Sequence, residues 1–215
     1  MSVEIALRAA RVRYGPLEAL HGLDLALPAG TVTVLLGRNG SGRSTALRAL
    51  AGTVPLSGGR VVWRGEDVTR VPAHLRARRG LCFVPDLRAV YGTLTVAENL
   101  DLAVPGRRDE ALAAYPELAR LLDHRAATLS GGERRMLALV RAVCGTARVV
   151  LVDEPSLGLS ASVASRTYGL LAALAAPPAG AAVVLAEQRV PAGLPAGSLG
   201  YELRRGALAS CGELV

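Results

Sequence analysis

Residues 31–45 read TVTVLLGRNGSGRST, and this short stretch decides the fold. Thr31–Leu36 is an unbroken run of β-branched residues and leucines, a pattern typical of a strand buried on both faces. A turn rich in glycine follows at 37–42, and the pattern of Arg43–Ala51 indicates a helix. A buried strand, a glycine-rich turn and a helix in this order predict a phosphate-binding loop at the edge of a parallel sheet.

The turn matches the phosphate-loop pattern Gly-x4-Gly-Lys-Ser/Thr except at Arg43, which stands where lysine is expected. Its glycines let successive backbone N–H groups face the phosphates, and the following helix adds its positive end. We expect Ser44 to hold Mg²⁺ and Thr45 to hydrogen-bond a phosphate. For this segment alone, a glycine-rich turn without a ligand is the alternative interpretation. The predicted nucleotide-binding residues of the loop are Gly37, Asn39, Gly40, Ser41, Gly42, Arg43, Ser44 and Thr45.

A second apolar segment, Val149–Pro155, reads VVLVDEP and contains two adjacent carboxylates. We expect its acidic end to lie beside the phosphate loop, because both follow the carboxyl ends of neighbouring parallel strands. Asp153 is then placed to hold Mg²⁺, directly or through water, and Glu154 to orient and polarise an attacking water. An acidic cap on a strand end is the competing interpretation, and it does not require four aliphatic residues before the acidic pair.

The segment Leu129–Glu133 reads LSGGE and opens a predicted helix. Ser130 and Glu133 have the spacing of a capping box, which is a structural explanation for both residues. Gly131 and Gly132 disfavour a helix, and their bare N–H groups suit the approach of a negatively charged ligand. The two interpretations stand side by side at this stage.

Strands and helices alternate along the rest of the chain. Ile5–Leu27 alternates apolar and polar residues around a break at Gly15 and Pro16, as two antiparallel strands do. Further strands are expected at 59–63, 80–84, 149–152 and 182–186, and helices at 95–122 (interrupted at 105–106 and at Pro116), 130–144 and 161–173. We therefore predict an α/β fold with a mostly parallel core sheet, an N-terminal antiparallel β part and an inserted α-helical part. We expect a single domain, 1–215, with a nucleotide-binding core at 1–86 and 145–215 and a helical insertion at 87–144.

All 25 basic residues are arginines, and the formal net charge is +7. A hydrophobic fraction of 51% excludes a disordered chain, and no Gly-X-Y repeat indicates collagen. The arginines are scattered and aromatic residues make up only 3%, so we expect no nucleic-acid partner. A genome biased towards arginine explains the charge more simply, and attraction to anionic lipid headgroups is a third explanation.

Cysteine usage and hydropathy both indicate a cytoplasmic protein. Cys82, Cys144 and Cys211 have no metal-ligand spacing and fit free thiols in a reducing compartment. No signal peptide is expected, because charged residues begin at Glu4. The uncharged run 167–186 contains two prolines and a glycine at its middle, so we expect a helix end, a turn and a strand there instead of a membrane span.

In four motifs the chain resembles the nucleotide-binding subunit of ATP-binding-cassette (ABC) transporters, in the family's order and over nearly the whole sequence. These motifs are GRNGSGRST at 37–45, LSGGE at 129–133, VVLVDEP at 149–155 and SLGLS at 156–160. The resemblance implies that two cassettes, identical or not, enclose two ATP molecules head to tail, with Mg²⁺. Ser130, Gly131 and Gly132 of one cassette would then contact the γ-phosphate bound by the other. It also implies transmembrane permease subunits and a place at the inner face of the cell membrane.

The resemblance assigns three further site residues. Tyr14 stands where the family has an aromatic residue that stacks on adenine, with a tyrosine at the rim of the core as the alternative. Asp86 stands at the family's Q-loop, which normally supplies a glutamine to Mg²⁺ and the attacking water. Gln188 stands at the switch position, where most cassettes have histidine. The predicted catalytic residues are therefore Glu154, Asp86 and Gln188, and the predicted metal ligands Ser44, Asp86 and Asp153.

The chain has an acidic residue at the Q-loop and a glutamine at the switch. In these two features it resembles the second ATP-binding protein of branched-chain amino-acid importers, and of related amide and urea importers. This implies ATP-driven import, with a substrate-binding protein as a further candidate partner. Arg43 raises a second hypothesis, a cassette that binds nucleotide but hydrolyses it weakly as the weaker half of a heterodimer, because arginine is longer and forked where lysine is compact. A third hypothesis, a cassette acting on DNA or ribosomes, lacks the coiled-coil arms, zinc modules or second cassette usual in such proteins.

Overall fold

The computed structural model describes residues 2–86 and 89–214. The strands are β1 (Val3–Tyr14), β2 (Leu17–Pro28), β3 (Thr31–Leu36), β4 (Gly58–Trp63), β5 (Glu66–Asp67), β6 (Leu81–Val84), β7 (Val149–Asp153), β8 (Ala182–Glu187), β9 (Leu199–Arg204) and β10 (Ala207–Glu213). The helices are α1 (Arg43–Ala51), α2 (Ala73–Arg78), α3 (Val96–Ala103), α4 (Arg108–Ala114), α5 (Gly131–Val143) and α6 (Ala161–Ala175), with 3₁₀ turns η1 (Pro116–Leu121) and η2 (Ala126–Thr128).

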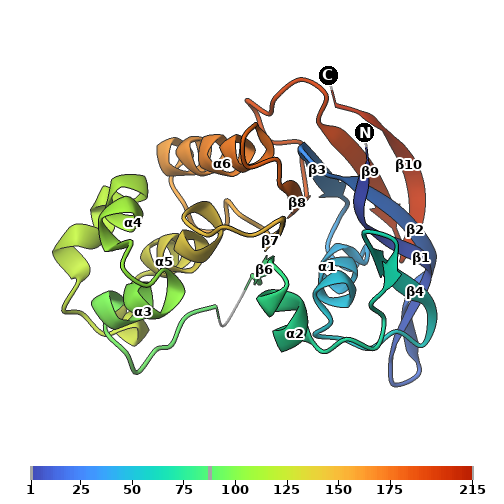
Figure 1. Ribbon diagram of the computed structural model, residues 1–215, viewed down its shortest axis with the longest axis horizontal. Coiled ribbons are helices and arrows are strands. Elements are labelled where there is room, and N and C mark those ends of the chain that lie inside the picture. The colour runs from blue at the N-terminus through green and yellow to red at the C-terminus, as the bar shows by residue number, and fades with distance from the viewer. Residues whose placement is uncertain (1, 87–88, 215) are drawn as a thin grey trace.

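These strands form two sheets (Figure 1). An antiparallel sheet has the order β2-β1-β4-β5, and a larger sheet has the order β10-β9-β3-β8-β7-β6. All neighbouring strands of the larger sheet are parallel except β9 and β10. The predicted α/β fold with a mostly parallel core sheet and an N-terminal antiparallel part is confirmed.

The central strands are buried on both faces, which explains their continuous apolar sequences. On β7, Val150 and Val152 belong to the core cluster shared with α5 and α6, whereas Val149 and Leu151 belong to the cluster shared with α1 and the antiparallel sheet. Each fully buried valine or leucine contributes about 1.5–3 kcal/mol of transfer free energy. The sheet is therefore a stable platform for the loops that follow its strands.

The helices between β6 and β7 lie together at the end of the molecule away from β1, β2 and β4 (Figure 1). α3 begins at a capping box, in which Thr95 Oγ1 accepts from the Glu98 N–H and the Glu98 carboxylate accepts from the Thr95 N–H. The expected interruption at 105–106 is present, because α3 ends at Ala103 and α4 begins at Arg108. The predicted boundary at 87 lies outside the described residues.

The order of the larger sheet corrects one expectation. β8 lies between β3 and β7, so the phosphate loop and the acidic pair do not follow neighbouring strands as predicted. They still meet, because the loop and the start of α1 reach across the end of β8 and place Ser44 Oγ 3.0 Å from Asp153 Oδ1. The division of the run 167–186 into the end of α6, a turn and β8 is confirmed.

Three strands and one helix were not expected from the sequence. β5 has only two residues, β10 is exposed along its whole length, β9 contains Gly200, and α2 has only six residues. None of these segments has an apolar period long enough to indicate its structure. Within the described residues, no helix has the length and apolar character needed to cross a membrane. All three cysteines are free thiols, as expected.

Candidate functional site

The phosphate loop is a close-packed turn that needs glycine at both ends. A Cβ atom on Gly37 would stand 2.5 Å from the Leu203 carbonyl oxygen and from Ser41 Oγ. Gly42 has a φ of 103°, and a Cβ there would lie 3.2 Å from the Ala19 carbonyl oxygen. No side chain caps α1 at Gly42, so the first N–H groups of this helix are available to an anion.

The unexpected strands β9 and β10 support this loop from outside. Their turn donates a hydrogen bond from the Gly206 N–H to the Ser41 carbonyl at 2.9 Å. The Gly206 carbonyl in turn accepts from the His21 N–H on β2 at 2.9 Å. The antiparallel sheet therefore holds the β9–β10 turn, and this turn holds the phosphate loop.

Asp153 and Ser44, two of the three predicted metal ligands, are in direct contact. Ser44 Oγ donates to Asp153 Oδ1 at 3.0 Å, and Asp153 is almost fully buried at the end of β7. Burial raises the pKa of Asp153, and the hydrogen bond from Ser44 opposes that shift. Its other oxygen, Oδ2, is buried without a hydrogen-bond partner among the described residues.

These two residues fit Mg²⁺ by their chemistry. A carboxylate oxygen without a partner and a hydroxyl are hard oxygen ligands of the kind Mg²⁺ prefers. In residues 2–86 and 89–214 no cluster of three or more His, Cys, Asp or Glu side chains could hold a metal. This agrees with the usual binding of Mg²⁺ by one or two protein groups together with substrate phosphates and water.

Arg43 and Glu154 are paired inside the site. Arg43 Nη2 donates to Glu154 Oε1 at 3.0 Å, and the Arg43 side chain is only 5% exposed. Its other terminal nitrogen, Nη1, is buried without a partner among the described residues, as is Ser41 Oγ. Partnerless polar atoms on Ser41, Arg43 and Asp153 thus gather around the loop, as expected where a polar ligand binds.

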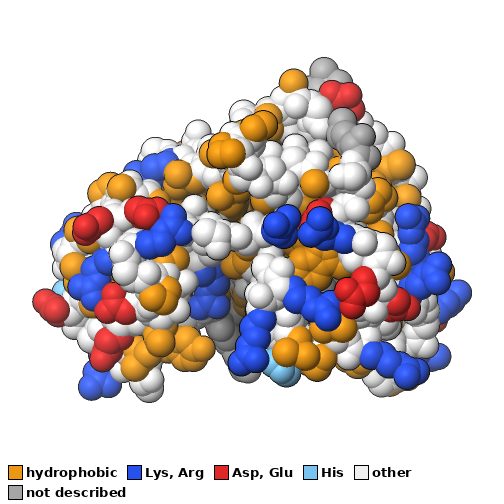
Figure 2. Space-filling model, viewed as in Figure 1, with side chains coloured by type: hydrophobic (Ala, Val, Ile, Leu, Met, Phe, Trp, Pro, Cys, Tyr) orange, Lys and Arg blue, Asp and Glu red, His pale blue; other side chains and the backbone are white. Residues whose placement is uncertain are grey.

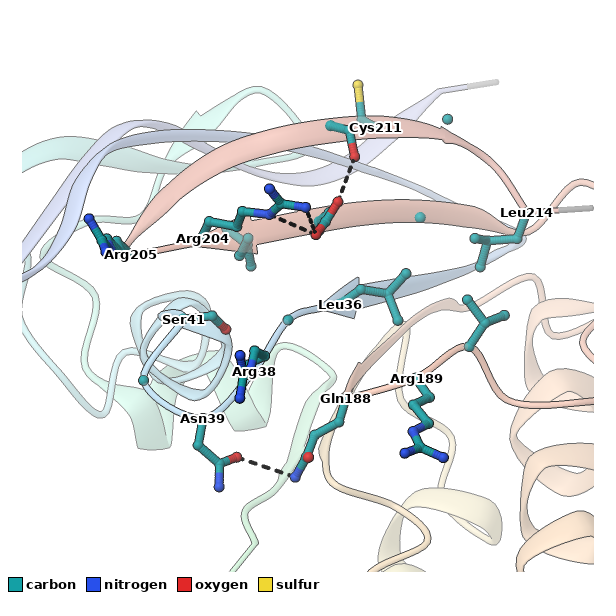
Figure 3. A pocket seen from close by; sticks show the side chains of 18 of the residues that line it. Leu36, Arg38, Asn39, Ser41, Gln188, Arg189, Arg204, Arg205, Cys211 and Leu214 are labelled. Carbon is teal, nitrogen blue, oxygen red and sulfur yellow. Dashed lines mark hydrogen bonds and ion pairs between the residues drawn. The ribbon is translucent and has the colours of Figure 1, made fainter.

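The remaining predicted catalytic residues line the same cavity, which has a volume of about 400 Å³. Asp86 lies 3.5 Å from Arg48 of α1, measured from Oδ1 to Nη2. Gln188 Nε2 donates to Asn39 Oδ1 at 3.2 Å, and Figure 3 shows these two side chains pointing toward one another. A larger cavity of about 910 Å³ shares residues 38–41 of the loop with this one and is also lined by residues of β9 and β10 (Figure 3).

Tyr14, Ser130, Gly131 and Gly132 do not line the phosphate-loop cavity in this single chain. Tyr14 ends β1 and is 41% exposed. Ser130 forms the predicted capping box with Glu133, since each side chain accepts from the other residue's N–H. The structural explanation of this motif is therefore confirmed, whereas its contact with a nucleotide stays a prediction.

One buried carboxylate near the site has no role predicted from the sequence. Glu187 ends β8 directly before Gln188 and accepts hydrogen bonds from Tyr168 Oη and, at 3.3 Å, from Ser156 Oγ. Burial raises the pKa of Glu187. The sequence contains one signal for Glu187, an acidic residue at the end of an apolar strand. Its two hydroxyl partners come from distant segments.

On the face drawn in Figure 2, arginine side chains are scattered among acidic and apolar ones and do not form one continuous stripe.

A buried parallel strand, a glycine-rich phosphate loop and an aspartate–glutamate pair at the same edge define a P-loop nucleoside triphosphatase. The model of the family described as "ABC transporter" matches residues 20–157, and the chain belongs to that family. It is an ABC-type ATPase, the ATP-binding subunit of a transporter. Cassettes of this family act as dimers together with transmembrane permeases.

Relatives with known names agree with this assignment. The chain is 32% identical over 203 residues to the high-affinity branched-chain amino acid transport ATP-binding protein BraG of Pseudomonas aeruginosa, covering 91% of this chain and 86% of BraG. It is 38% identical over 155 residues to the probable branched-chain amino acid transport ATP-binding protein LivF of Archaeoglobus fulgidus, covering 68% and 66%. A dimeric ATP-binding cassette bound to ADP and phosphate superposes with a TM-score of 0.83 at 20% identity, covering 98% and 99%, which confirms the cassette fold.

Proposed function

We propose that this chain binds and hydrolyses MgATP in a cassette dimer and thereby drives import of branched-chain amino acids or a similar small polar solute. One observation supports the catalytic part: Ser44, which lines the phosphate-loop cavity together with Glu154, is hydrogen-bonded to Asp153. The names of BraG and LivF, together with Gln188 at the switch, support the substrate class.

The phosphate loop binds the β- and γ-phosphates through its N–H groups, the start of α1 and Arg43. Ser44 and Asp153 would hold Mg²⁺, which would neutralise phosphate charge there. Asp86, which lines the same cavity as Ser44, would be a third ligand. Tyr14, exposed at the end of β1, stacks on the adenine ring.

Glu154 is the general base of the reaction. It accepts a proton from the water whose oxygen attacks the γ-phosphorus, while the bond from that phosphorus to the bridging oxygen breaks and ADP leaves. Gln188 and Asp86 orient this water, since both side chains line the same cavity as Glu154. Ser130, Gly131 and Gly132 act on the nucleotide of the second cassette.

The helical residues 87–144 would couple the site to the permeases, and 1–86 with 145–215 would form the nucleotide-binding core. The chain would then sit at the inner face of the membrane through its permeases, with a substrate-binding protein delivering the solute. No role for nucleic acid is proposed.

The test is transport by the assembled complex with its permeases in sealed vesicles. We expect ATP-dependent uptake of leucine, isoleucine or valine that Glu154→Gln abolishes without preventing assembly. Uptake that continues with Glu154→Gln contradicts the catalytic assignment. ATP turnover that no branched-chain amino acid stimulates contradicts the substrate class alone.

The ion pair between Arg43 and Glu154 favours a second candidate, a cassette with intact nucleotide binding and weak hydrolysis. The pair engages Oε1 of Glu154, one of the two carboxylate oxygens that could receive the proton of water. In this case the chain would be the weaker half of a heterodimer, with LSGGE completing the site of the other cassette. A complex whose ATP turnover is unaffected by Glu154→Gln would support this candidate over the first.

A further inference from the structure

Arg135 is a buried arginine on α5 whose guanidinium binds backbone carbonyls and no carboxylate among the described residues. It is 3% exposed. Nη1 donates to the Pro85 carbonyl at 2.7 Å, and Nη2 donates to the Asp153 carbonyl. Taking a guanidinium out of water is costly unless it is well hydrogen-bonded, so an arginine in this position requires an explanation.

The two carbonyls share a property. Each belongs to the peptide bond that directly precedes a carboxylate of the proposed site, Asp86 in one case and Glu154 in the other. A peptide unit is planar, so holding its oxygen also fixes the direction in which the next residue begins. The two terminal nitrogens of one guanidinium therefore fix the peptide units that lead into Asp86 and Glu154.

Glu154 needs such a restraint. Its φ is 51°, a left-handed conformation that residues other than glycine seldom adopt. Its N–H donates to the Ala186 carbonyl at 3.0 Å, while the oxygen of the same peptide unit accepts from Arg135. The peptide bond before Glu154 is thus held from both sides, by β8 and by α5.

We propose that Arg135 is a positioning residue that holds Glu154 and Asp86 in register with α5, the helix that begins with Gly131 and Gly132. This rests on the proposed function of Glu154. Ser130 caps the N-terminus of α5, against which a nucleotide bound by the second cassette would lie. Through α5 and Arg135, that nucleotide acts on the backbone of this chain's own catalytic residues. The two ATP sites of a dimer are linked through one side chain.

The experiment compares Arg135→Met, Arg135→Lys and a matched control, Arg141→Met, which removes an arginine from the last turn of the same helix. Hydrogen–deuterium exchange of the full chain without nucleotide is the first measurement, because it does not depend on activity. In Arg135→Met we expect exchange to rise about tenfold in the segment containing the Glu154 amide, which corresponds to about 1.4 kcal/mol. Exchange in α6 and in the control should match the wild type.

ATP turnover is the second measurement. We expect Arg135→Met to lower kcat by about tenfold or more, with KM for ATP changed by less than about threefold, since the phosphate loop is untouched. Arg135→Lys keeps the charge but offers no fork, so its kcat should stay below half of the wild-type value.

The proposal is overturned if Arg135→Met and Arg141→Met give the same exchange around Glu154, or if exchange rises uniformly over the chain. Full activity and wild-type exchange in Arg135→Lys would show that charge alone acts, which also overturns it. A wild-type chain without ATP turnover would contradict the proposed function, whereas the exchange comparison would still decide the role of Arg135.

Discussion

Arg43 Nη2 lies 3.0 Å from Glu154 Oε1, in an ion pair that joins the phosphate loop to the residue after β7. The two residues are separated by 111 positions in the sequence, and their side chains are only 5% and 19% exposed. Arginine reaches this carboxylate because it is long and forked, whereas lysine is a compact point charge. A nucleotide that competes for Arg43 would release Glu154.

Arg43→Lys should therefore raise the rate of ATP hydrolysis. The shorter ammonium stays among the loop N–H groups and leaves Glu154 free to accept a proton. We expect kcat to increase by about tenfold, or about 1.4 kcal/mol of barrier. Steady-state phosphate release measures it, with Arg43→Met as the control that loses the charge and weakens nucleotide binding. Equal kcat values for wild type and Arg43→Lys would show that the pair does not limit the reaction.

Glu154→Gln should abolish turnover and retain nucleotide. The amide cannot accept the proton of water, and loss of a general base lowers the rate by about 10²–10⁴-fold. Titration with a fluorescent ATP analogue should give an affinity at least equal to that of the wild type, because the pairing with Arg43 is weakened. Glu66→Gln is a suitable control, since its ion pair with Arg79 lies at the surface. Undiminished phosphate release from Glu154→Gln would mean that another group is the base.

Asp153→Asn tests the metal site separately from the nucleotide site. Oδ2 has no hydrogen-bond partner among the described residues, and Oδ1 is bound to Ser44. Loss of the charge should weaken binding of MgATP by at least about tenfold, since even residues behind a metal ligand contribute 10–100-fold. Isothermal titration in EDTA should show that binding of metal-free ATP is not weakened. Equal losses with and without Mg²⁺ would indicate general damage to the loop.

The parts of this molecule that follow from local sequence were predictable, and contacts between distant segments were not. The apolar runs at β3, β7 and β8 are continuous because both sheet faces are covered, so period and length identified them. The motif spacing likewise identified Ser44 and Asp153. The position of β8 between β3 and β7 has no local signature, because strand order depends on where each connection crosses the sheet.

Arg135 illustrates why one proposed positioning residue was not visible in the sequence. Within LSGGERR it is one of two adjacent arginines, and nothing local distinguishes the buried one from Arg134. Its role appears only when Pro85 and Asp153, which are distant in sequence, converge on it. Glu187 is similar, because Tyr168 and Ser156 reach it from α6 and from the loop after Glu154.

Glu187 should make the folded chain less stable as pH rises. Burial raises its pKa above the ordinary 4.5, so the folded chain holds this proton more tightly than the unfolded chain. The stabilisation is complete below the unfolded value and is lost as pH increases through the raised one. Glu187→Gln keeps an acceptor for Tyr168 and Ser156 but does not titrate. Its melting temperature should fall less than that of the wild type between about pH 5 and pH 8. Identical slopes of melting temperature against pH in the wild type and in Glu187→Gln would contradict this prediction.

Substitution of each of the two adjacent glycines at the start of α5 distinguishes the structural role of the LSGGE motif from its proposed contact with a second cassette. A Cβ on Gly132 would stand 2.6 Å from the Gly158 carbonyl oxygen, so Gly132→Ala should destabilise the chain by about 1–3 kcal/mol. A Cβ on Gly131 meets nothing within 4 Å. Gly131→Ala should therefore leave the melting temperature unchanged or raise it, because alanine favours a helix by about 0.5–1 kcal/mol.

Gly131→Ala should nevertheless reduce ATP turnover, because the added methyl group stands on the open face that a phosphate of the second cassette approaches. The loss should be confined to conditions in which cassettes dimerise, with nucleotide affinity of the single chain unchanged. Turnover measured against protein concentration, alongside analytical ultracentrifugation, checks this expectation. If Gly131→Ala hydrolysed ATP at the wild-type rate, the start of α5 would have a structural role alone, in which Ser130 and Glu133 form the capping box and Gly132 is required by its close approach to Gly158.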